Sequence, residues 1–472
     1  MTLRLHDTLT RRLREVTPLE PGHVRLYTCG PTVWNRAHIG NFRTFLFEDV
    51  LRRALEQRFA RVTHVMNLTD VDDRLIRNAG EHGNTLDEET APWIGAFFED
   101  VDTLGIRRAH HYPRATEYVP QMVDLVERLS ERGVTYSTDG SIYFRIGDFP
   151  EYGRLSGAAE RELKAGASGR IDADDYSKED ARDFALWKAV GPQEIGWDTR
   201  LGRGRPGWHL ECSAMSMSLL GESFDIHCGG IDNIFPHHEN EIAQSEAATG
   251  RQFVSIWAHS EHLRIDDEKM SKRLGNFITL PQALADSHRA ASAVRFLLTA
   301  TVHYRKTLNF SSESLAMAAE QVDRLAGFAD RLGDAVRVAD GSNEGYELAA
   351  TAQQAFDARL DDDLNLPGAV GELSVALRDA NRQLDAGPVT AAAHAALSGL
   401  VEHADDVLGI LPLVQRERDA ALDDDTRELL LQRERARASR DFVLSDRLRL
   451  ELRERGLTVE DTPKGQRWRP VT

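Results

Sequence analysis

The chain has few cysteines and no long apolar run, and both absences limit what it can be. Only Cys29, Cys212 and Cys228 occur among 472 residues, so there is no disulfide framework and a reducing compartment suits the protein. No stretch approaches the ~20 apolar residues that a membrane-spanning helix needs. The first residues, MTLRLHDTLTRRLREV, also lack the apolar centre of a signal peptide. We therefore expect a cytoplasmic protein without a membrane segment.

Positive charge is scarce as well. The chain has 58 Lys and Arg against 76 Asp and Glu, a formal net charge of −18 at pH 7, which disfavours non-specific binding to nucleic acid. Residues 427–472 are an exception, because they hold 12 basic and 8 acidic residues. A polyanionic partner would therefore have to bind a local basic surface, and this stretch offers one.

What the sequence does contain is an alternation of strand and helix patterns. Residues 24–30 (VRLYTCG) are typical of a buried strand that ends in a glycine turn, and residues 61–70 (RVTHVMNLTD) of a second strand. Between them, residues 41–59 place apolar side chains at helical spacing. Strand, glycine turn, helix and strand form the unit of a doubly wound sheet, which binds ligands at the carboxyl ends of its strands. Cys29, His38 and Thr69 fall at such ends.

The length indicates two to four domains. We expect an α/β fold with a doubly wound, parallel-sheet (Rossmann-type) domain that is split by an insertion, then an α-helical bundle and a small α/β C-terminal domain. Mixed patterns mark the insertion, with a polar loop inside it, and Ala- and Leu-rich heptad-like segments mark the bundle. The chain should end in a short hairpin. The expected boundaries are 1–114 and 201–309 for the two halves of the split domain, 115–200 for the insertion, 310–412 for the bundle and 413–472 for the terminal domain.

Residues 235–246, FPHHENEIAQSE, combine two histidines with three acidic residues. In one interpretation Pro236 starts a helix and the acidic residues complement the positive end of its dipole. In the other the segment binds a metal, because His237 and Glu241 are four residues apart and share one face of a helix. These twelve residues alone leave both interpretations open.

Two further short motifs are weak when each is taken alone. HIGN (38–41) could simply start a helix, and KMSKR (269–273) could be a solvated basic patch. Their order and their expected elements favour a common function. His38 at a helix N-terminus can hydrogen-bond a nucleotide phosphate, and Lys269 and Lys272 on a mobile loop can neutralise phosphate charge in the transition state. Together they indicate adenylation, in which a carboxylate attacks the α-phosphate of ATP and pyrophosphate leaves.

HIGN and KMSKR resemble the two signature motifs of class I aminoacyl-tRNA synthetases. Longer segments resemble the cysteinyl-tRNA synthetase family in particular, and the resemblance runs the whole length of the chain. It rests on CGPTVWNRAHIGNFR, NLTDVDD, GRPGWHLECSAM, DIHCGGIDNIFPHHENEIAQSE, EKMSKRLGNF, HYRKTLNFS and RDFVLSDRLRLELRERGLTVEDTPKGQRWR. The resemblance implies an enzyme that activates L-cysteine with ATP and Mg²⁺, forms cysteinyl-adenylate and pyrophosphate, and transfers cysteine to tRNA(Cys) with release of AMP. We expect a monomer.

The resemblance also implies one Zn²⁺ per chain. Two thiolates, an imidazole and a carboxylate suit this ion. Shape alone discriminates poorly between near-isosteres such as cysteine and serine, whereas a zinc–thiolate contact selects sulfur. Selection of this kind requires no editing domain, and we see no segment long enough to be one. The implied ligands are Cys29, Cys212, His237 and Glu241.

Three other residues of these segments are not expected to bind the ion. Cys228 is expected to be a small buried residue. His238 and Glu239 are expected either on the helix surface or as groups that orient the ligands.

The remaining site residues are also implied by the resemblance. Cys29, Thr69, Trp208, His227 and Asp232 would line the cysteine site, although Trp208 could also be an ordinary core tryptophan. His38, Gly40, Asn41 and Lys272 would contact ATP, and His38, Asn41, Lys269 and Lys272 would be the catalytic set. Asn41 replaces the usual second histidine, so it can donate a hydrogen bond but cannot carry a proton, and Arg273 replaces the final serine of the lysine motif.

The C-terminal domain would read the anticodon, because single-stranded RNA bases are recognised by stacking and by hydrogen bonds to their edges. The implied contacts are Arg437, Phe442, Asp446 and Asp461, with Phe442 at a position that is often tryptophan. The alternative is that the arginine-rich helix is a solvated face and Phe442 belongs to the core.

Three other functions can be weighed on the sequence. An enzyme of the same ancestry that joins cysteine to an aminosugar would end sooner and would not need the basic C-terminal stretch. A non-catalytic RNA- or zinc-binding relative would be expected to lose His38 or a lysine of the KMSK motif. A pyridoxal phosphate-dependent persulfide activity is disfavoured, because Arg74 and Arg77 replace the required lysines and arginine forms no Schiff base.

Overall fold

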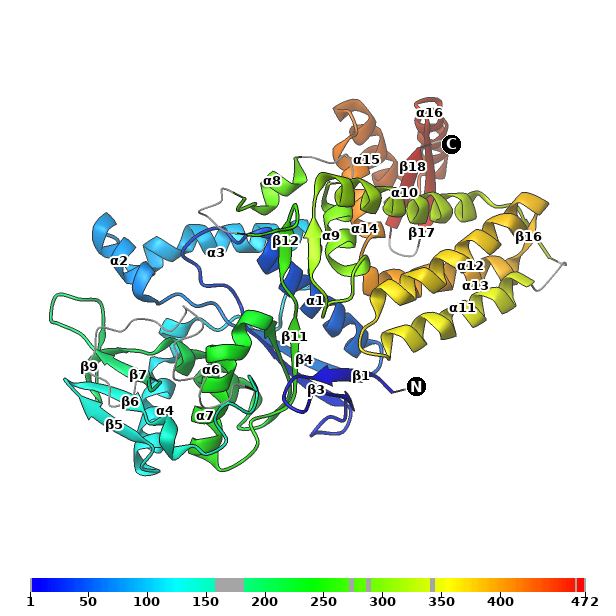
Figure 1. The fold of residues 1–472 in the computed structure, drawn as a ribbon. Helices are drawn as coiled ribbons and strands as arrows, with labels where there is room; N and C mark the ends of the chain where they lie inside the picture. Colours follow the sequence, from blue (N-terminus) through cyan, green and yellow to red (C-terminus); the bar gives the residue numbers. More distant parts are fainter. Residues whose placement is uncertain are drawn as a thin grey trace.

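The computed structural model describes residues 2–157, 182–270, 276–285, 290–339, 344–462 and 465–470. Figure 1 shows an α/β body in the middle of the molecule, with a second sheet at one end and a bundle of long helices at the other. The C-terminal domain lies beyond the α/β body on the side of the bundle. The fold class predicted from the sequence is confirmed, whereas the domain boundaries stay a prediction.

In the described part of the chain, the central sheet has four parallel strands in the order β11-β10-β3-β4. Helix α1 (Ile39–Glu56) connects β3 to β4, and helix α7 (Glu239–Thr249) connects β10 to β11. Because β3 and β10 are neighbours, the strand order reverses between them, and sheets of this kind bind ligands at that point. The strands are His23–Thr28 (β3), Arg61–Met66 (β4), Phe224–Gly230 (β10) and Val254–Ser260 (β11).

Helix α1 confirms the helical pattern seen between the first two strands. His38 caps its start: the Asn41 backbone N–H donates to His38 Nδ1 (3.2 Å), and the His38 backbone N–H donates to Asn41 Oδ1 (3.1 Å). This reciprocal pair satisfies two donors that a helix start leaves without a partner. Phe42 and Leu46 on the apolar face are fully buried.

The insertion carries its own antiparallel sheet, whose described strands have the order β5-β6-β7-β9-β8. The predicted polar loop, 165–183, falls almost wholly outside the described residues. The strands are Thr135–Thr138 (β5), Ser141–Phe144 (β6), Phe184–Ala189 (β7), Trp197–Thr199 (β8) and Gly202–Pro206 (β9). The described α-helices between β4 and β10 are Asp73–His82 (α2), Leu86–Thr103 (α3), Val119–Glu131 (α4) and Trp208–Leu220 (α6).

Long helices fill most of the described chain from residue 290 to residue 420. They are Ala290–Ala300 (α9), Ser312–Asp334 (α10), Glu344–Leu360 (α11), Leu366–Ala386 (α12), Ala391–Leu408 (α13) and Leu411–Ala420 (α14). The remaining short elements of the first 420 residues that carry strand or α-helix are Arg4–Asp7 (β1), Arg12–Glu15 (β2), Leu263–Ile265 (β12), Glu268–Lys269 (β13), Leu280–Leu284 (α8), Leu308–Phe310 (β14), Arg337–Val338 (β15) and Val389–Thr390 (β16).

One apolar core continues from α1 into the bundle and fixes the bundle against the site. Leu46 of α1, Leu297 of α9 and Phe356 of α11 belong to this core. A buried ion pair crosses the same boundary, because Arg295 Nη2 donates to Asp49 Oδ2 at 2.6 Å and neither side chain is exposed. Arg53 Nε also donates to Asp49 Oδ2 at 2.8 Å, so removing Asp49 would leave two buried guanidinium groups without their carboxylate, at a cost of ~3–5 kcal/mol.

The C-terminal domain packs two helices against a hairpin. Its elements are Asp424–Ala438 (α15), Phe442–Glu454 (α16), Leu457–Thr462 (β17) and Gly465–Pro470 (β18). The two strands are antiparallel, which confirms the predicted hairpin. No helix in the described part of the chain combines the length and the apolar character that crossing a membrane requires.

Candidate functional site

Four elements bring the candidate ligands together beyond the carboxyl ends of β3 and β10. Cys29 follows β3, Cys212 lies in α6, His237 lies in the turn before α7, and Glu241 lies in the first turn of α7. One ligand atom from each lies within 4.8 Å of all the others, and all four residues are buried. We call these four residues the Cys–His–Glu cluster.

The turn before α7 differs from the helix that Pro236 predicted. Helix α7 begins only at Glu239, because Phe235 has extended backbone angles (φ −137°, ψ 131°) that place a kink within residues 234–238. His237 Nε2 still lies 3.0 Å from Glu241 Oε1. The spacing therefore predicted the juxtaposition of these two residues correctly, although His237 lies outside the helix.

Hydrogen bonding and charge set the protonation of the Cys–His–Glu cluster. The hydrogen bond with Cys29 lowers the pKa of Cys212 to about 6, whereas burial raises the pKa of Cys29 well above its ordinary value. Burial alone would lower the pKa of His237, but the Glu241 carboxylate and the Cys212 thiolate raise it to about 10. Burial disfavours ionised Glu241, but His227 and His237 lower its pKa to about 2. A thiolate and a carboxylate are thus ready to bind a cation at neutral pH.

The donor set fits a thiophilic divalent cation. Two sulfur atoms, an imidazole and a carboxylate form a four-ligand set of the kind that zinc prefers. Among the described residues, Glu241 Oε1 has no well-aligned hydrogen-bond donor, although it lies within ion-pair distance of His237. A buried oxygen in that state can accept a cation.

Trp208 covers the cluster from the side of the insertion. Its ring stacks on His237 with centroids 4.4 Å apart and planes at 19°, and the residue is 39% exposed. The interpretation of Trp208 as an ordinary core residue is therefore wrong. A pocket of about 450 Å³ opens beside it, lined also by Trp34, His209 and Glu211.

The other three residues expected in the cysteine site differ in their placement. His227 reaches the cluster, because its Nε2 lies 3.0 Å from Glu241 Oε2. Thr69 is buried after β4, and its Oγ1 accepts a hydrogen bond from Asn67 Nδ2 at 3.1 Å. Asp232 is exposed in the short turn Ile231–Asn233 after β10.

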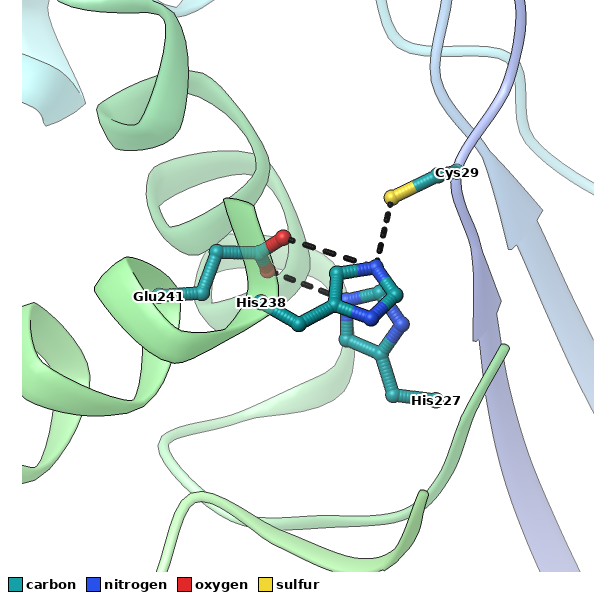
Figure 2. Close-up of side chains that lie close together, drawn as sticks. All are labelled: Cys29, His227, His238 and Glu241. Carbon is teal, nitrogen blue, oxygen red and sulfur yellow. Dashed lines mark hydrogen bonds and ion pairs between the residues drawn. The ribbon is translucent and has the colours of Figure 1, made fainter. Parts of the chain in front are cut away.

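His238 and Glu239 are buried, so their expected alternative position on the helix surface is wrong. His238 Nε2 lies 3.2 Å from Cys29 Sγ, a contact that Figure 2 shows. The Glu239 carboxylate accepts backbone N–H groups from the preceding insertion segment, residues 153–156. The donors are Gly153 (3.0 Å), Leu155 (3.3 Å) and Ser156 (2.7 Å).

Two histidines at this site were not singled out from the sequence. His209 Nδ1 lies 2.9 Å from His237 Nδ1, and His259 Nε2 lies 2.8 Å from His238 Nδ1. His209 stands next to Trp208 in a segment that carries the family resemblance, which was the available signal. His259 lies near the end of a buried strand, where the local sequence gives no sign of this contact.

The HIGN motif starts α1, as the blander interpretation predicted, and it also lies beside the KMSK segment. A Cβ on Gly40 would lie 3.0 Å from the His38 ring and 3.2 Å from Met270 Cε, so glycine allows this close approach. The Ile39 backbone N–H donates to the Ile278 carbonyl at 2.9 Å. The two motifs are therefore neighbours in space.

The KMSK segment itself is only partly described. Lys269 lies at the end of β13, and its backbone is opposite that of Arg264 in the antiparallel pairing of β13 with β12. Lys272 and Arg273 lie outside the described residues. Arg74 and Arg77 are exposed on α2, and the Arg74 guanidinium lies 5.0 Å from the centroid of the Trp34 ring.

In the C-terminal domain, Arg437 Nη1 lies 2.9 Å from Asp461 Oδ2. Arg433 binds the same carboxylate through both Nη atoms, at 3.0 and 2.9 Å. Phe442 is 56% exposed at the start of α16, so its alternative assignment to the core is wrong. Asp446 is also exposed.

Comparison with known proteins covers nearly the whole chain. Residues 15–320 match the family described as tRNA synthetases class I (C) catalytic domain, residues 355–412 match the DALR domain, and residues 419–469 match the cysteinyl-tRNA ligase anticodon binding domain. The cysteine–tRNA ligase of Protochlamydia amoebophila is 45% identical over 98% of this chain and 97% of its own. That of Geobacillus thermodenitrificans is 42% identical over 99% of both.

Among solved structures, Mycobacterium tuberculosis methionyl-tRNA synthetase in complex with methionyl-adenylate matches with a TM-score of 0.60 and 16% identity. The match covers 86% of this chain and 95% of that one. At this identity the likeness concerns the fold alone. The matched family domains and the full-length relatives together show that the chain is an enzyme of the cysteine–tRNA ligase family of class I tRNA synthetases.

Proposed function

We propose that this protein activates L-cysteine with ATP and transfers it to tRNA(Cys). In the first step the cysteine carboxylate attacks the α-phosphorus of ATP, the bond to the β-phosphate oxygen breaks, and pyrophosphate leaves. In the second step a ribose hydroxyl at the tRNA end attacks the carbonyl carbon of cysteinyl-adenylate, and AMP leaves. The observation that carries the choice of amino acid is the buried Cys–His–Glu cluster beside Trp208.

Zinc is the ion that we assign to this cluster, with Cys29, Cys212, His237 and Glu241 as its ligands. Bound there, the ion would favour the thiolate form of the substrate side chain over a serine hydroxyl. The chain's own contribution is to exclude water from this contact, because all four ligands are buried. Trp208, stacked on His237, would close the pocket over the substrate.

The other cysteine contacts that we assign are Thr69, His227 and Asp232. His227 holds Glu241 in place through the 3.0 Å contact and thereby orients one wall of the pocket. Asp232, on the exposed turn after β10, would face the substrate amine or the ribose. Thr69, at the end of β4, would line the opposite side.

ATP is assigned to the neighbouring HIGN and KMSK segments, with Mg²⁺ on its phosphates. The start of α1 offers backbone N–H groups and the positive end of a helix dipole. His38 and Asn41 would bind phosphate oxygens, and Gly40 leaves room for the His38 ring. Lys269 and Lys272 would neutralise charge that develops on the phosphates.

The tRNA is assigned to the C-terminal domain, with Arg437, Phe442, Asp446 and Asp461 at the anticodon. The matched anticodon binding domain supports this assignment. The exposed Phe442 ring offers a stacking face. Residues 1–114 and 201–309 would form the catalytic domain, 115–200 the connective insertion, 310–412 the helical bundle and 413–472 the anticodon-binding domain.

The direct test is ATP–pyrophosphate exchange measured with each of the twenty amino acids in turn. Cysteine alone should support exchange, and removal of tightly bound metal with a chelator should abolish it. Charging of tRNA(Cys) should then require the same amino acid. Exchange with serine at a comparable rate would contradict the proposal, and cysteine-dependent exchange without tRNA charging would favour an acceptor such as an aminosugar.

A further inference from the structure

A second set of four ligand groups lies beside the Cys–His–Glu cluster and shares two residues with it. Cys29 and Glu241 belong to the cluster with Cys212 and His237. They also face His227 and His238, as Figure 2 shows. One ligand atom each from Cys29, His227, His238 and Glu241 lies within 4.8 Å of the others, and all four residues are buried. We call these four residues the histidine-pair set.

The distances inside the histidine-pair set place two ring nitrogens toward the shared residues. His227 Nε2 lies 3.0 Å from Glu241 Oε2. His238 Nε2 lies 3.2 Å from Cys29 Sγ and 3.9 Å from Glu241 Oε1. The two carboxylate oxygens of Glu241 therefore serve different partners: Oε1 lies 3.0 Å from His237, and Oε2 faces His227.

The other nitrogen of each ring is already used, as is usual for metal-binding histidines. His227 Nδ1 lies 3.3 Å from the Cys228 carbonyl oxygen, which accepts a hydrogen bond in the tautomer that carries the hydrogen on Nδ1. His238 Nδ1 lies 2.8 Å from His259 Nε2, and His259 Nδ1 lies 2.7 Å from Thr8 Oγ1. These contacts, and the stacking of His227 on Trp257 at 4.6 Å, hold the rings with Nε2 toward Glu241 and Cys29.

The contact between His227 and Glu241 is one that a metal ion can enter. When the His227 hydrogen is on Nε2, this nitrogen donates an ordinary hydrogen bond to the carboxylate oxygen 3.0 Å away. When the hydrogen is on Nδ1, the Nε2 lone pair faces that oxygen, and a cation bound between or beside the two atoms can take the place of the proton. The nearby thiol of Cys29 and the imidazole of His238 supply the additional donors that a metal ion requires.

We propose that Cys29, His227, His238 and Glu241 form a second binding position for a divalent cation of the zinc or cobalt type. The proposal rests on the function proposed above, because the two positions share Cys29 and Glu241 and therefore hold one ion in alternative places. The first position has two thiolates and the second has one, so a thiophilic ion rests in the first while Cys212 is a ligand. The second position retains the ion in the buried site when Cys212 is lost from its coordination.

Cobalt(II) is the probe that distinguishes the two positions, because thiolate-to-cobalt absorption reports how many sulfur ligands the ion has. The wild-type enzyme, freed of metal and titrated with Co²⁺, should bind one ion per chain with a two-thiolate spectrum. The Cys212→Ser variant should still bind one ion per chain, more weakly, with the absorption of a single thiolate. The double variant Cys212→Ser/His238→Ala should bind none.

Two single variants control for folding. His238→Ala should keep the two-thiolate spectrum of the first position, which shows that the substitution leaves the buried site folded. Cys228→Ser changes a third buried thiol that belongs to neither set and should leave the cobalt titration unchanged.

The outcomes separate this proposal from the function on which it rests. A wild-type enzyme with a two-thiolate spectrum and cysteine-dependent exchange, together with a Cys212→Ser variant that binds no cobalt even at saturation, would overturn only the second position. The same holds if Cys212→Ser binds cobalt equally well with and without His238, because the ion then has other ligands. A wild-type enzyme with no thiolate-bound cobalt would overturn the first position as well.

Discussion

The Cys–His–Glu cluster and the C-terminal domain place their candidate binding groups in opposite surroundings. Cys212 is 1% exposed and Glu241 is fully buried, and each touches other ionisable groups of the cluster. Phe442, by contrast, is 56% exposed, and its neighbour Val443 is 85% exposed. Groups in the cluster therefore depend on one another for compensation of charge, whereas the candidate contacts of the C-terminal domain are in contact with solvent, including the ion pair between Arg437 and Asp461.

This difference has energetic consequences. A buried charged or polar group that loses its partner has no water to replace it, so a single substitution is expected to affect the whole cluster. An exposed ion pair contributes about 0–1 kcal/mol to the free energy of unfolding, and salt screens the attraction between its charges. Substitutions in the cluster should therefore have large, non-additive effects on activation of cysteine, and substitutions in the C-terminal domain should have small effects that are confined to charging of tRNA.

The largest effect is expected for Cys212→Ser. Serine keeps the shape but replaces a thiolate, formed here at a pKa of about 6, with a hydroxyl that stays neutral. Cysteine-dependent pyrophosphate exchange should fall by more than about 100-fold, above the range found for residues that only support a ligand. Binding of ATP, measured by calorimetry, should remain. Exchange within a few-fold of wild type would mean that Cys212 is only a buried small residue.

A smaller effect is expected for Glu239→Gln, which tests how the insertion holds the ligand-bearing helix. The carboxylate accepts three backbone N–H groups from residues 153–156, and the amide can accept fewer while placing an N–H among these donors. Zinc affinity, measured by competition with a chromophoric chelator, should fall about 10- to 100-fold.

Glu151→Gln is the matched control for that variant. Glu151 belongs to the same insertion segment, but it is exposed and pairs with Arg154, so its loss should leave the zinc affinity unchanged. Equal zinc affinity in the two variants would show that the contacts of Glu239 do not position His237 and Glu241.

A moderate effect on tRNA alone is expected for Phe442→Ala. Stacking of a base on an aromatic ring contributes ~1–3 kcal/mol, so kcat/KM for charging of tRNA(Cys) should fall about tenfold while pyrophosphate exchange stays at the wild-type rate. Phe442→Trp should restore charging, because it keeps a stacking face. Val443→Ala removes a more exposed neighbouring side chain and should do little. Loss of exchange in Phe442→Ala would contradict the separation of the two regions.

The sequence predicted the elements around the site better than the contacts inside it. Strands β3 and β4 and helix α1 were found within a few residues of their bounds, because alternation and helical spacing are local properties. The start of α7 was predicted too early, because the extended backbone of Phe235 cannot be read from a proline and its neighbours. The ligand set depended on family resemblance, since Cys29 and Cys212 are far apart in the chain.

Contacts made through tertiary structure had no local signal. Glu239 was expected on the surface or in a supporting role, and its three donors come from a segment whose sequence, GRLS, indicates only a turn. His259 was missed for the same reason, because its contact with His238 joins β11 to the turn before α7. Patterns in a sequence report which face of an element is buried, but they do not report which buried groups meet.

The smallest effect is expected for Arg437→Ala, and its size distinguishes two ways of binding RNA. Arg437 is half-exposed and shares Asp461 with Arg433, whose side chain is almost fully buried. Because Arg433 keeps the carboxylate paired, the loss of Arg437 should change the free energy of unfolding by less than about 1 kcal/mol. KM for tRNA(Cys) should rise about fivefold, equivalent to ~1 kcal/mol, without any change in pyrophosphate exchange.

If Arg437 contacts a base, the variant should also charge anticodon mutants and wild-type tRNA more equally. If Arg437 contacts only phosphate, the binding of all tRNAs should weaken by the same factor, and the affinity should depend less steeply on salt concentration. Arg435→Ala, which removes a more exposed arginine from the same helix, is the matched control. A rise in KM as large for Arg435→Ala as for Arg437→Ala, with no change in anticodon preference, would mean that α15 acts as a general basic surface and not as a reader of sequence.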